Sequence, residues 1–299
     1  TMSDFRLKAF ISVAKNLSFT KASKELYISQ PAITRHIQEL EAKYHIALFE
    51  RMGNKIKLTR AGEILLEHSE RIVEDYKRLE YDLHLLTNTY AGELRIGAST
   101  TIAQYVLPAV LAKFVDKFPD VKISLLNSNS RQIESALGEH RIDLGMVEGI
   151  QHTPNIKYTV FMQDELVAVV SNRSKLSRRD EISLCELPHI PLVLREQGSG
   201  TLDVLEAALL PYSIKLSYLN VQMFLGSTES IKRYLEHSDC MGIVSFRAIQ
   251  QEVLEGKLKI IDFKECRIER NFSFIQQYGQ DTGLAAAFIQ FAMHYNKEI

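Results

Sequence analysis

"ISQPAITRHIQELE", residues 28–41, has the apolar spacing of a helix but carries a proline near its beginning. Proline is tolerated in the first turn of a helix, where its missing N–H would have no intrahelical partner. Ser29 can cap that turn with its hydroxyl. We therefore expect a helix that begins near Gln30, and the polar residues of its first turn need an explanation.

Two shorter helical patterns precede this stretch, over about residues 4–14 and over "TKASKELY", residues 20–27. Two short helices joined by a tight connection form a helix-turn-helix, whose second helix lies in the major groove of DNA. After the third helix, "LFER" and "IKL" around "MGN" predict a hairpin of two short strands. Residues 1–60 are therefore predicted to be a winged helix-turn-helix DNA-binding domain.

The first turn of such a recognition helix reaches base edges, so its side chains must be short or polar. Gln30 can form a bidentate contact with adenine, and Arg35 suits phosphate or guanine. Ser29 and Thr34 can meet phosphate or base. The predicted wing carries three basic residues, Arg51, Lys55 and Lys57.

Charge is distributed unevenly along the 299 residues, whose net charge is −1. Residues 1–60 hold eleven Lys and Arg against five Asp and Glu, which is +6 and leaves −7 for the rest. A basic first part on an acidic remainder suggests a polyanion partner for the first part only. A solvated basic face, or a three-helix unit that binds protein, is the alternative that charge alone leaves open.

The dense pattern from residue 10 to residue 62 resembles the LysR-type transcriptional regulators, through "LSFTKASKELYISQPAITRHIQELE", "LFER" and "LTRAGE". The resemblance implies a winged helix-turn-helix head, a long dimerising helix and two α/β lobes that resemble periplasmic binding proteins. It places Gln30, Pro31, Thr34, Arg35 and Arg51 against DNA. The predicted DNA-binding set is Ser29, Gln30, Pro31, Thr34, Arg35, Arg51, Lys55 and Lys57.

A long helix is predicted over residues 59–88, which contain no proline. Apolar residues recur in it every seven positions, at Leu65, Ile72, Leu79 and Leu86. Tyr76 and Leu83 fill the intermediate positions of the same stripe. Such a seam is typical of a two-stranded coiled coil, although a core helix within one domain is the alternative. We expect a homodimer or homotetramer with a linker and dimerisation helix at 61–91.

Strands and helices alternate over residues 92–299, which predicts an α/β fold with a largely parallel sheet. We expect two lobes, with lobe I formed by 92–162 and 268–299 and lobe II by 163–267. A helix over 102–118 with a bend at Pro108, a strand at "DELVAVVS", residues 164–171, and a strand at "KLSYLN", residues 215–220, belong to this prediction.

Hydroxyl residues gather at four predicted strand-to-helix turns of these lobes. Free N–H groups at helix starts favour an anion there, and ligands of such folds bind beyond the carboxyl ends of strands. Ser and Thr are also ordinary helix caps, which is the simpler reading. The resemblance places effector pockets at these turns. The predicted effector set is Ser99, Thr100, Thr101, Ser130, Glu148, Ser199, Gly200, Thr201 and Thr228.

Glu148 complicates a purely anionic ligand, because a carboxylate in the cleft would repel a dianion unless Arg195 or a ligand ammonium offsets it. This favours an amino-acid-like or other zwitterionic effector beside a simple anion. The alternative places Glu148 in solvent or in a surface ion pair.

The leading hypothesis is therefore a cytoplasmic, effector-responsive transcription factor that binds double-stranded DNA. An enzyme is not expected, because nucleotide-binding, hydrolase and zinc-protease motifs are missing from the sequence. We predict no catalytic residue, no metal, no cofactor and no membrane association. A solute-binding protein is disfavoured by the basic head and by an opening, "TMSDFRLKAF", without a signal pattern. A redox sensor is disfavoured because Cys185, Cys240 and Cys266 lack a paired spacing.

Overall fold

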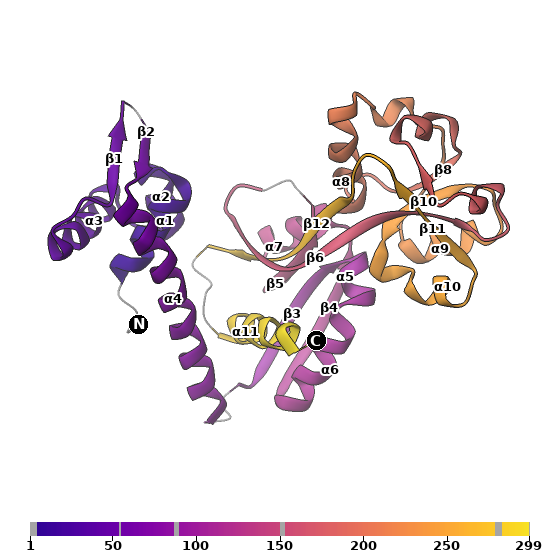
Figure 1. The fold of residues 1–299 in the computed structure, drawn as a ribbon. Helices are drawn as coiled ribbons and strands as arrows, with labels where there is room; N and C mark the ends of the chain where they lie inside the picture. Colours follow the sequence, from indigo (N-terminus) through magenta and orange to yellow (C-terminus); the bar gives the residue numbers. More distant parts are fainter. Residues whose placement is uncertain (1–4, 54, 87–89, 150–152, 279–282, 299) are drawn as a thin grey trace. The chain divides into compact units, whose positions relative to one another are not determined.

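The structure is a computed structural model that describes residues 5–53, 55–86, 90–149, 153–278 and 283–298. The chain divides into two compact units, residues 1–90 with 278–290 and residues 91–277 with 291–299 (Figure 1). We call residues 5–58 the head and residues 91–277 the body.

The head consists of three helices and a two-stranded hairpin around one apolar core. These elements are α1 (Phe5–Asn16), α2 (Phe19–Leu26), α3 (Gln30–Tyr44), β1 (Phe49–Met52) and β2 (Lys55–Leu58). Ser29 caps α3 by accepting a hydrogen bond from the N–H of Ala32 at 3.4 Å, and Pro31 lies in the first turn. Phe10, Ile33 and Leu48 are buried together between the helices and the hairpin. The predicted winged helix-turn-helix is confirmed.

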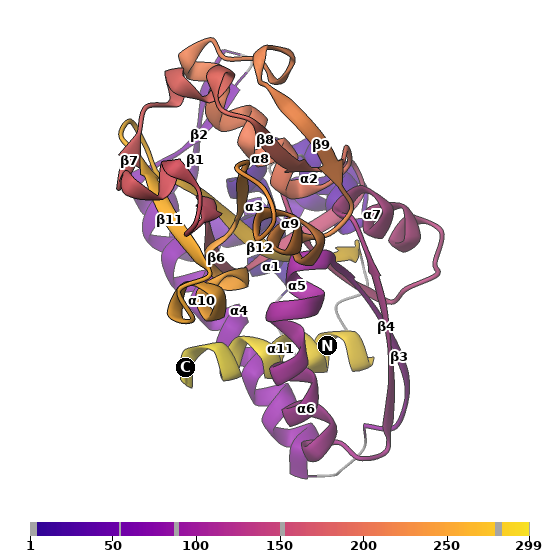
Figure 2. The same ribbon diagram turned by 90° about the vertical axis from the view of Figure 1, so that its right-hand side faces the viewer.

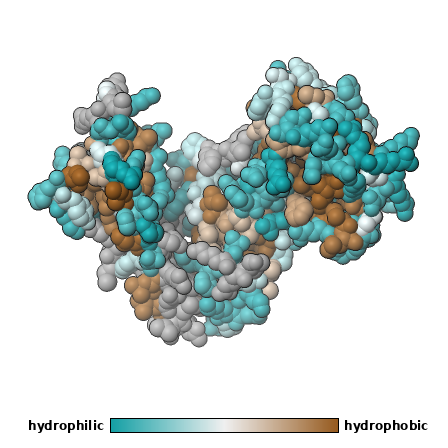
Figure 3. All heavy atoms as spheres, viewed as in Figure 1, coloured by the Kyte–Doolittle hydropathy of each residue, from teal (hydrophilic) through white to brown (hydrophobic). Residues whose placement is uncertain are grey.

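The helix α4 (Arg60–Leu86) follows the hairpin and has 27 residues. Leu65, in its second turn, packs on the core of the head. Further along, Ile72, Leu79 and Leu83 are 53%, 48% and 54% exposed. Figure 3 shows hydrophobic residues at the surface of this part of the helix. The predicted seam is thus solvent-facing at Ile72, Leu79 and Leu83 in the single chain, whereas the side chain of Leu86 lies outside the described residues.

The body contains one large mixed sheet flanked by helices (Figures 1 and 2). Its strands are β3 (Gly92–Ser99), β4 (Val121–Ser128), β5 (Leu144–Glu148), β6 (Ile156–Ser171), β7 (Glu181–Ile182), β8 (Leu192–Arg195), β9 (Val221–Leu225), β10 (Met241–Ser245), β11 (Leu258–Phe263) and β12 (Ile268–Gln277). Its α-helices are α5 (Thr100–Tyr105), α6 (Leu107–Lys117), α7 (Ser130–Gly138), α8 (Gly200–Leu209), α9 (Thr228–Leu235) and α10 (Gln250–Leu254). The last helix, α11 (Gly283–Glu298), follows the body in the chain, and the division between the two compact units falls within it. Short 3-10 helices are η1 (Lys175–Arg178), η2 (Leu184–His189), η3 (Leu210–Tyr212), η4 (Leu216–Tyr218) and η5 (Phe246–Ala248).

Two long strands, β6 and β12, join two lobes. Lobe I contains β3–β5 with α5–α7, and lobe II contains β7–β11 with α8–α10. Within lobe I, β3 pairs in parallel with β4 and β5, and within lobe II, β8 pairs in parallel with β9 and β10. β6 and β12 run antiparallel to each other, and β6 is also antiparallel to β10 and β11. The prediction of a largely parallel sheet therefore holds within the lobes and is wrong at their junction, where the chain crosses and returns.

Three local predictions need correction. Residues 215–220 contain η4, and the strand β9 begins only after them. The helix expected over 102–118 is two helices that meet at Val106, with Pro108 in the first turn of α6. β6 begins at Ile156, eight residues before the strand expected at 164–171. β6 begins earlier because it pairs antiparallel with β12, which returns much later in the chain. The sequence pattern around β6 alone does not reveal this partner. The exact residue bounds of the two lobes stay a prediction.

Candidate functional site

The first turn of α3 presents polar groups to solvent. Ser29, Gln30 and Pro31 are exposed, and Thr34 is half-buried. Thr20 Oγ1 donates to Gln30 Oε1 at 3.2 Å, while Thr34 Oγ1 donates to the backbone carbonyl of Gln30 at 3.1 Å. The predicted recognition residues therefore share one accessible helix end.

Basic side chains lie beside that turn and on the hairpin. Arg35 is 79% exposed and its Nε donates to Glu39 Oε1 at 2.9 Å. On β2, Lys57 Nζ lies 2.7 Å from Glu50 Oε1, and Lys55 is exposed. Arg51 lies on β1 opposite Ile56, but its side chain is outside the described part of the chain. Exposed pairs of this kind contribute about 0–1 kcal/mol, so these cations can exchange a carboxylate for a phosphate at small cost.

Four of the predicted effector residues meet where the two lobes touch. Glu148, the last residue of β5, is 2% exposed, and the hydroxyl of Ser99 donates to its Oε2. Ser130 Oγ donates to the backbone carbonyl of Glu148 at 2.8 Å. From lobe II, Gly200 approaches so closely that an added Cβ would lie 1.9 Å from that carbonyl oxygen. The alternative of Glu148 in solvent or in a surface ion pair is therefore wrong.

A buried arginine, Arg270 on β12, lies under this junction. Its Nε donates to Asp164 Oδ2 at 2.7 Å, and its Nη1 donates to Thr201 Oγ1 at 2.9 Å. Nη1 also lies 3.7 Å from Glu148 Oε1. Ser245 Oγ donates to Asp164 Oδ1 at 2.8 Å. One guanidinium thus faces two buried carboxylates, and it is Arg270, not Arg195, that lies beside Glu148.

Arg195, at the end of β8, forms a second contact between the lobes. Its side chain is 1% exposed and its Nε donates to Glu196 Oε2 at 2.9 Å. Its Nη2 donates to Thr100 Oγ1 of lobe I at 3.3 Å, and its Nη1 donates to Thr228 Oγ1 at 3.4 Å. Two of the predicted hydroxyls therefore hold this arginine in place.

The helix-cap alternative explains some of the predicted hydroxyls but not all. Ser199 caps α8 by accepting from the N–H of Leu202 at 3.3 Å. Ser99 stands at the cap position of α5 without a side-chain capping bond, because its hydroxyl faces Glu148. Thr101 Oγ1 and Arg270 Nη2 are buried and have no hydrogen-bond partner among the described residues. Such buried unpaired groups are rare and are candidates for ligand contacts.

A further cross-lobe cluster surrounds Lys232, which is 4% exposed on α9. Its Nζ lies 2.6 Å from Glu229 Oε1 and 2.8 Å from Glu252 Oε1. The hydroxyl of Tyr105, from lobe I, donates to Glu229. Burial and this hydrogen bond raise the pKa of Tyr105 above its usual value, so the phenol keeps its proton and remains a hydrogen-bond donor.

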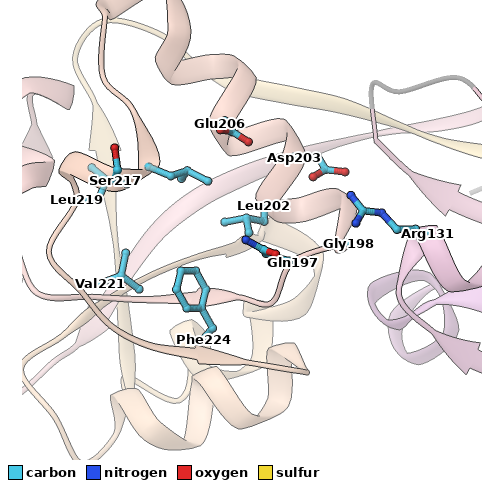
Figure 4. A pocket seen from close by; sticks show the side chains of 11 residues that line it. Arg131, Gln197, Gly198, Leu202, Asp203, Glu206, Ser217, Leu219, Val221 and Phe224 are labelled. Atoms are coloured by element: carbon cyan, nitrogen blue, oxygen red, sulfur yellow. The ribbon is translucent and has the colours of Figure 1, made fainter.

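A pocket of about 570 Å³ opens beside the first turn of α8 (Figure 4). Figure 4 shows the side chains of Arg131 and Asp203 pointing toward one another at one end. Burial raises the pKa of Asp203, while the charge of Arg131 opposes that rise. None of the residues of the predicted effector set lines this pocket. Its lining is Arg131, Gln197, Gly198, Leu202, Asp203, Glu206, Leu216, Ser217, Leu219, Val221 and Phe224.

Arg270 and Lys232 were not predicted from the sequence, although each leaves a signal in it. Ile268, Arg270, Phe272 and Phe274 alternate along β12 as its inward-facing residues. On α9, Thr228, Ile231, Lys232 and Leu235 form the buried stripe. A basic residue within the apolar face of a strand or of a helix indicates that its charge has a buried partner.

A winged helix-turn-helix head followed by a two-lobed α/β body defines a DNA-binding regulator with a ligand-binding domain. Residues 5–63 match the family model "Bacterial regulatory helix-turn-helix protein, lysR family", and residues 87–296 match "LysR substrate binding domain". The chain belongs to the LysR family of transcriptional regulators.

Similar proteins cover nearly the whole chain. The uncharacterized HTH-type transcriptional regulator YeiE of Escherichia coli K12 is 32% identical over 89% of this chain and 88% of its own length. The HTH-type transcriptional regulator CysL of Bacillus subtilis is 28% identical over 90% of this chain and 89% of its own length. These relatives are regulators of transcription.

Solved structures share the fold of the body. The Synechocystis CcmR regulatory domain in complex with 2-PG superposes with a TM-score of 0.63 at 24% identity, over 70% of this chain and 99% of that one. The effector-binding domain of QuiR with shikimate gives 0.62 at 17% identity, over 70% and 98%. Across the described residues, no helix has the length and apolarity to span a membrane, and no cluster of His, Cys, Asp and Glu is arranged to hold a metal ion.

Proposed function

We propose that this regulator is switched by a small anionic or zwitterionic metabolite bound between lobes I and II. The observation that carries the proposal is the convergence of both lobes on Glu148 and Arg270, together with two buried donors that have no partner in the described part of the chain, Arg270 Nη2 and, two residues after Ser99, Thr101 Oγ1. A ligand oxygen can accept from these donors, and hydrogen bonds to charged groups are the strong ones. The small molecules named with CcmR and QuiR support a ligand in this type of domain.

Ligand binding at this junction would change how tightly the lobes close. The lobes already meet through Arg195 and Thr100, and through the N–H of Arg131, which donates to the carbonyl of Gly198 at 3.2 Å. A ligand that bridges the same elements binds the closed arrangement of the lobes more tightly than the open one, and so shifts the equilibrium toward closure. We propose that this change alters the spacing of the DNA-binding heads in a homo-oligomer in the cytoplasm.

The head is proposed to read DNA with the exposed first turn of α3 and to contact the backbone with its wing. The proposed set is Ser29, Gln30, Pro31, Thr34, Arg35, Arg51, Lys55 and Lys57. The proposed effector set is Ser99, Thr100, Thr101, Ser130, Glu148, Ser199, Gly200, Thr201 and Thr228.

Calorimetry on the full chain tests the effector site, with amino acids, organic acids and oxyanions screened first by thermal shift. Thr101→Val removes an unpaired donor from a buried position without breaking a described hydrogen bond, so folding should be preserved. Affinity should fall by on the order of 1.5–3 kcal/mol if the hydroxyl contacts a charged ligand. Ser135→Ala, on the exposed side of α7, is the control and should bind normally. Undiminished binding by Thr101→Val would place the ligand elsewhere.

Sedimentation tests the proposed homodimer or homotetramer. Leu79→Asp with Leu83→Asp would bury two charges in the seam of α4, which is costly without partners. The expected result is a folded chain that dissociates. An unchanged oligomer would place the interface outside this seam.

A further inference from the structure

The carboxylate of Glu148 is fixed at the lobe junction and cannot turn to solvent. Ser99 donates to its Oε2, Ser130 donates to its backbone carbonyl, and the backbone of Gly200 closes over that carbonyl. The residue is 2% exposed. A ligand that enters the proposed effector site must therefore meet this carboxylate where it stands.

Hydrogen bonding around Glu148 is incomplete on one side. Arg270 Nη1 is 3.7 Å from Oε1, which is an ion-pair distance but too long for a hydrogen bond. The same guanidinium already donates to Asp164 and Thr201. Among the residues that the structure describes, no hydrogen bond reaches Glu148 Oε1. One acceptor thus lacks a donor.

Two buried donors lack an acceptor. Arg270 Nη2 belongs to the guanidinium that faces Glu148, and Thr101 lies two residues after Ser99, whose hydroxyl touches Glu148. Both groups are buried and unpaired within the described chain. A ligand that completes this arrangement offers one N–H or O–H group and one or more acceptor oxygens.

We propose that Glu148 is the specificity-determining residue of the effector site and that it selects ligands that carry a proton donor next to an anionic oxygen. This inference rests on the proposed function of the lobe junction. A zwitterion such as an amino acid has this chemistry, and so does a hydrogen-oxyanion such as hydrogencarbonate. A dianion without a proton, such as sulfate, presents only acceptors to the carboxylate and is repelled, since like charges at short distance in a buried site repel strongly.

Replacement of Glu148 by glutamine is the sharpest change, because the side chain keeps its shape and an oxygen for the Ser99 hydroxyl. It loses the charge and gains an N–H group that can donate to a ligand oxygen. Calorimetry at constant ionic strength compares three test ligands on the full chain: glycine, hydrogencarbonate and sulfate. The natural chain should prefer glycine or hydrogencarbonate over sulfate. Binding of glycine would identify an ammonium group as the ligand's proton donor, and binding of hydrogencarbonate would identify a hydroxyl group.

In Glu148→Gln, sulfate affinity should rise by about tenfold or more, and affinity for the preferred donor-bearing ligand should fall by a similar factor. Glu148→Ala removes the charge without supplying a donor, and it replaces the glutamine variant in this test if that variant does not fold. Its sulfate affinity should lie between those of the natural chain and the glutamine variant. Glu148→Asp retains the charge and should continue to reject sulfate.

The Thr101→Val variant separates the two proposals. If it weakens binding of the preferred ligand while Glu148→Gln leaves the order of preference unchanged, the effector site stands and the selectivity inference is overturned. If Thr101→Val changes no affinity, the site itself is wrong. A Glu148→Gln or Glu148→Ala chain that binds sulfate no better than the natural chain overturns the inference, whichever ligand the natural chain binds.

Discussion

Arg35 of α3 has a side chain that is 79% exposed and pairs with Glu39 on its own helix, whereas Arg270 of β12 is completely buried and pairs with Asp164 on a neighbouring strand. The first pair contributes about 0–1 kcal/mol and is screened by salt. Breaking a buried pair by removing one partner costs about 3–5 kcal/mol, because a charge is left uncompensated. The head therefore keeps the charge of Arg35 available for a partner, while the lobe junction of the body has built the charge of Arg270 into the fold.

This difference has a consequence for binding. Groups in the head can exchange partners without changing the structure around them, which suits contacts with many DNA sequences. At the lobe junction, the proposed ligand would have to fit among hydrogen bonds that also hold the lobes together, such as Arg270 to Thr201 and Arg195 to Thr100. Binding at the proposed site would therefore be coupled to the relative position of the lobes, as a switch requires.

Removal of the buried cation should give the largest effect. Arg270→Met keeps much of the side-chain volume but leaves Glu148 and Asp164 without their guanidinium. Arg247 lies 3.9 Å from Asp164 and is 41% exposed, so it compensates only weakly. Unfolding of the body in urea, followed by circular dichroism of the full chain, should show a loss of about 3–5 kcal/mol.

Arg35→Met is the matched control, because an exposed surface substitution usually stays within about 0.5 kcal/mol. Equal stability of the two variants would contradict the contrast between a solvated head and a buried ionic junction.

A steric change at the same junction should give the next largest effect. An added Cβ at Gly200 would lie 1.9 Å from the carbonyl oxygen of Glu148, so Gly200→Ala must displace α8 or β5. Overpacking of this kind costs about 1–3 kcal/mol. Gly138→Ala is the control, since nothing lies within 4 Å of its added Cβ.

Thermal unfolding of both glycine variants, with effector titration, sharpens the comparison. Gly200→Ala should lower the stability of the body and weaken effector binding, whereas Gly138→Ala should do neither. If Gly200→Ala binds effector normally, the close approach of the lobes is not needed for binding.

The same contrast explains what the sequence could predict. The start of α3 depends on Ser29 and Pro31, which are neighbours in the chain, so a local pattern was sufficient. Arg270 depends on Asp164, a residue more than a hundred positions earlier that only the pairing of β6 with β12 brings close. The hydroxyls at Ser99 and Thr201 could be predicted as a group, but their partners could not.

The edge strand β9 is a second element whose position the sequence pattern could not predict. "KLSYLN" has strand-like alternation, yet it forms η4, and the strand β9 follows it. β9 lies at the edge of the sheet, and Met223 and Phe224 on it are exposed. Because its position is fixed by parallel pairing with β8 alone, the alternation within the chain does not locate it.

In the head, Gln30→Ala should change base preference without changing the fold. A bidentate amide contact typically gives about 1–3 kcal/mol of discrimination. Selection of binding sites from a random DNA library by the natural chain and by the variant measures this preference. Gln38→Ala, an exposed position further along α3, is the control and should select the same sites as the natural chain. Identical sites for Gln30→Ala would remove this residue from the recognition set.

The smallest expected effect concerns two lysines of the wing. Lys57 lies 2.7 Å from Glu50, whereas Lys55 is exposed and has no ion pair within the residues described. Each phosphate contact by a lysine contributes about 0.9 units to the salt slope of DNA binding, because one counterion is released. Lys55→Ala should therefore lower the slope by nearly one unit, and Lys57→Ala by less, since Glu50 already neutralises part of that charge. Fluorescence anisotropy with a random-sequence duplex over a range of salt concentrations measures both slopes. Lys122→Ala, exposed on β4 of the body, should leave the slope unchanged. Equal slopes for the natural chain and Lys55→Ala would mean that the wing does not contact the DNA backbone through this residue.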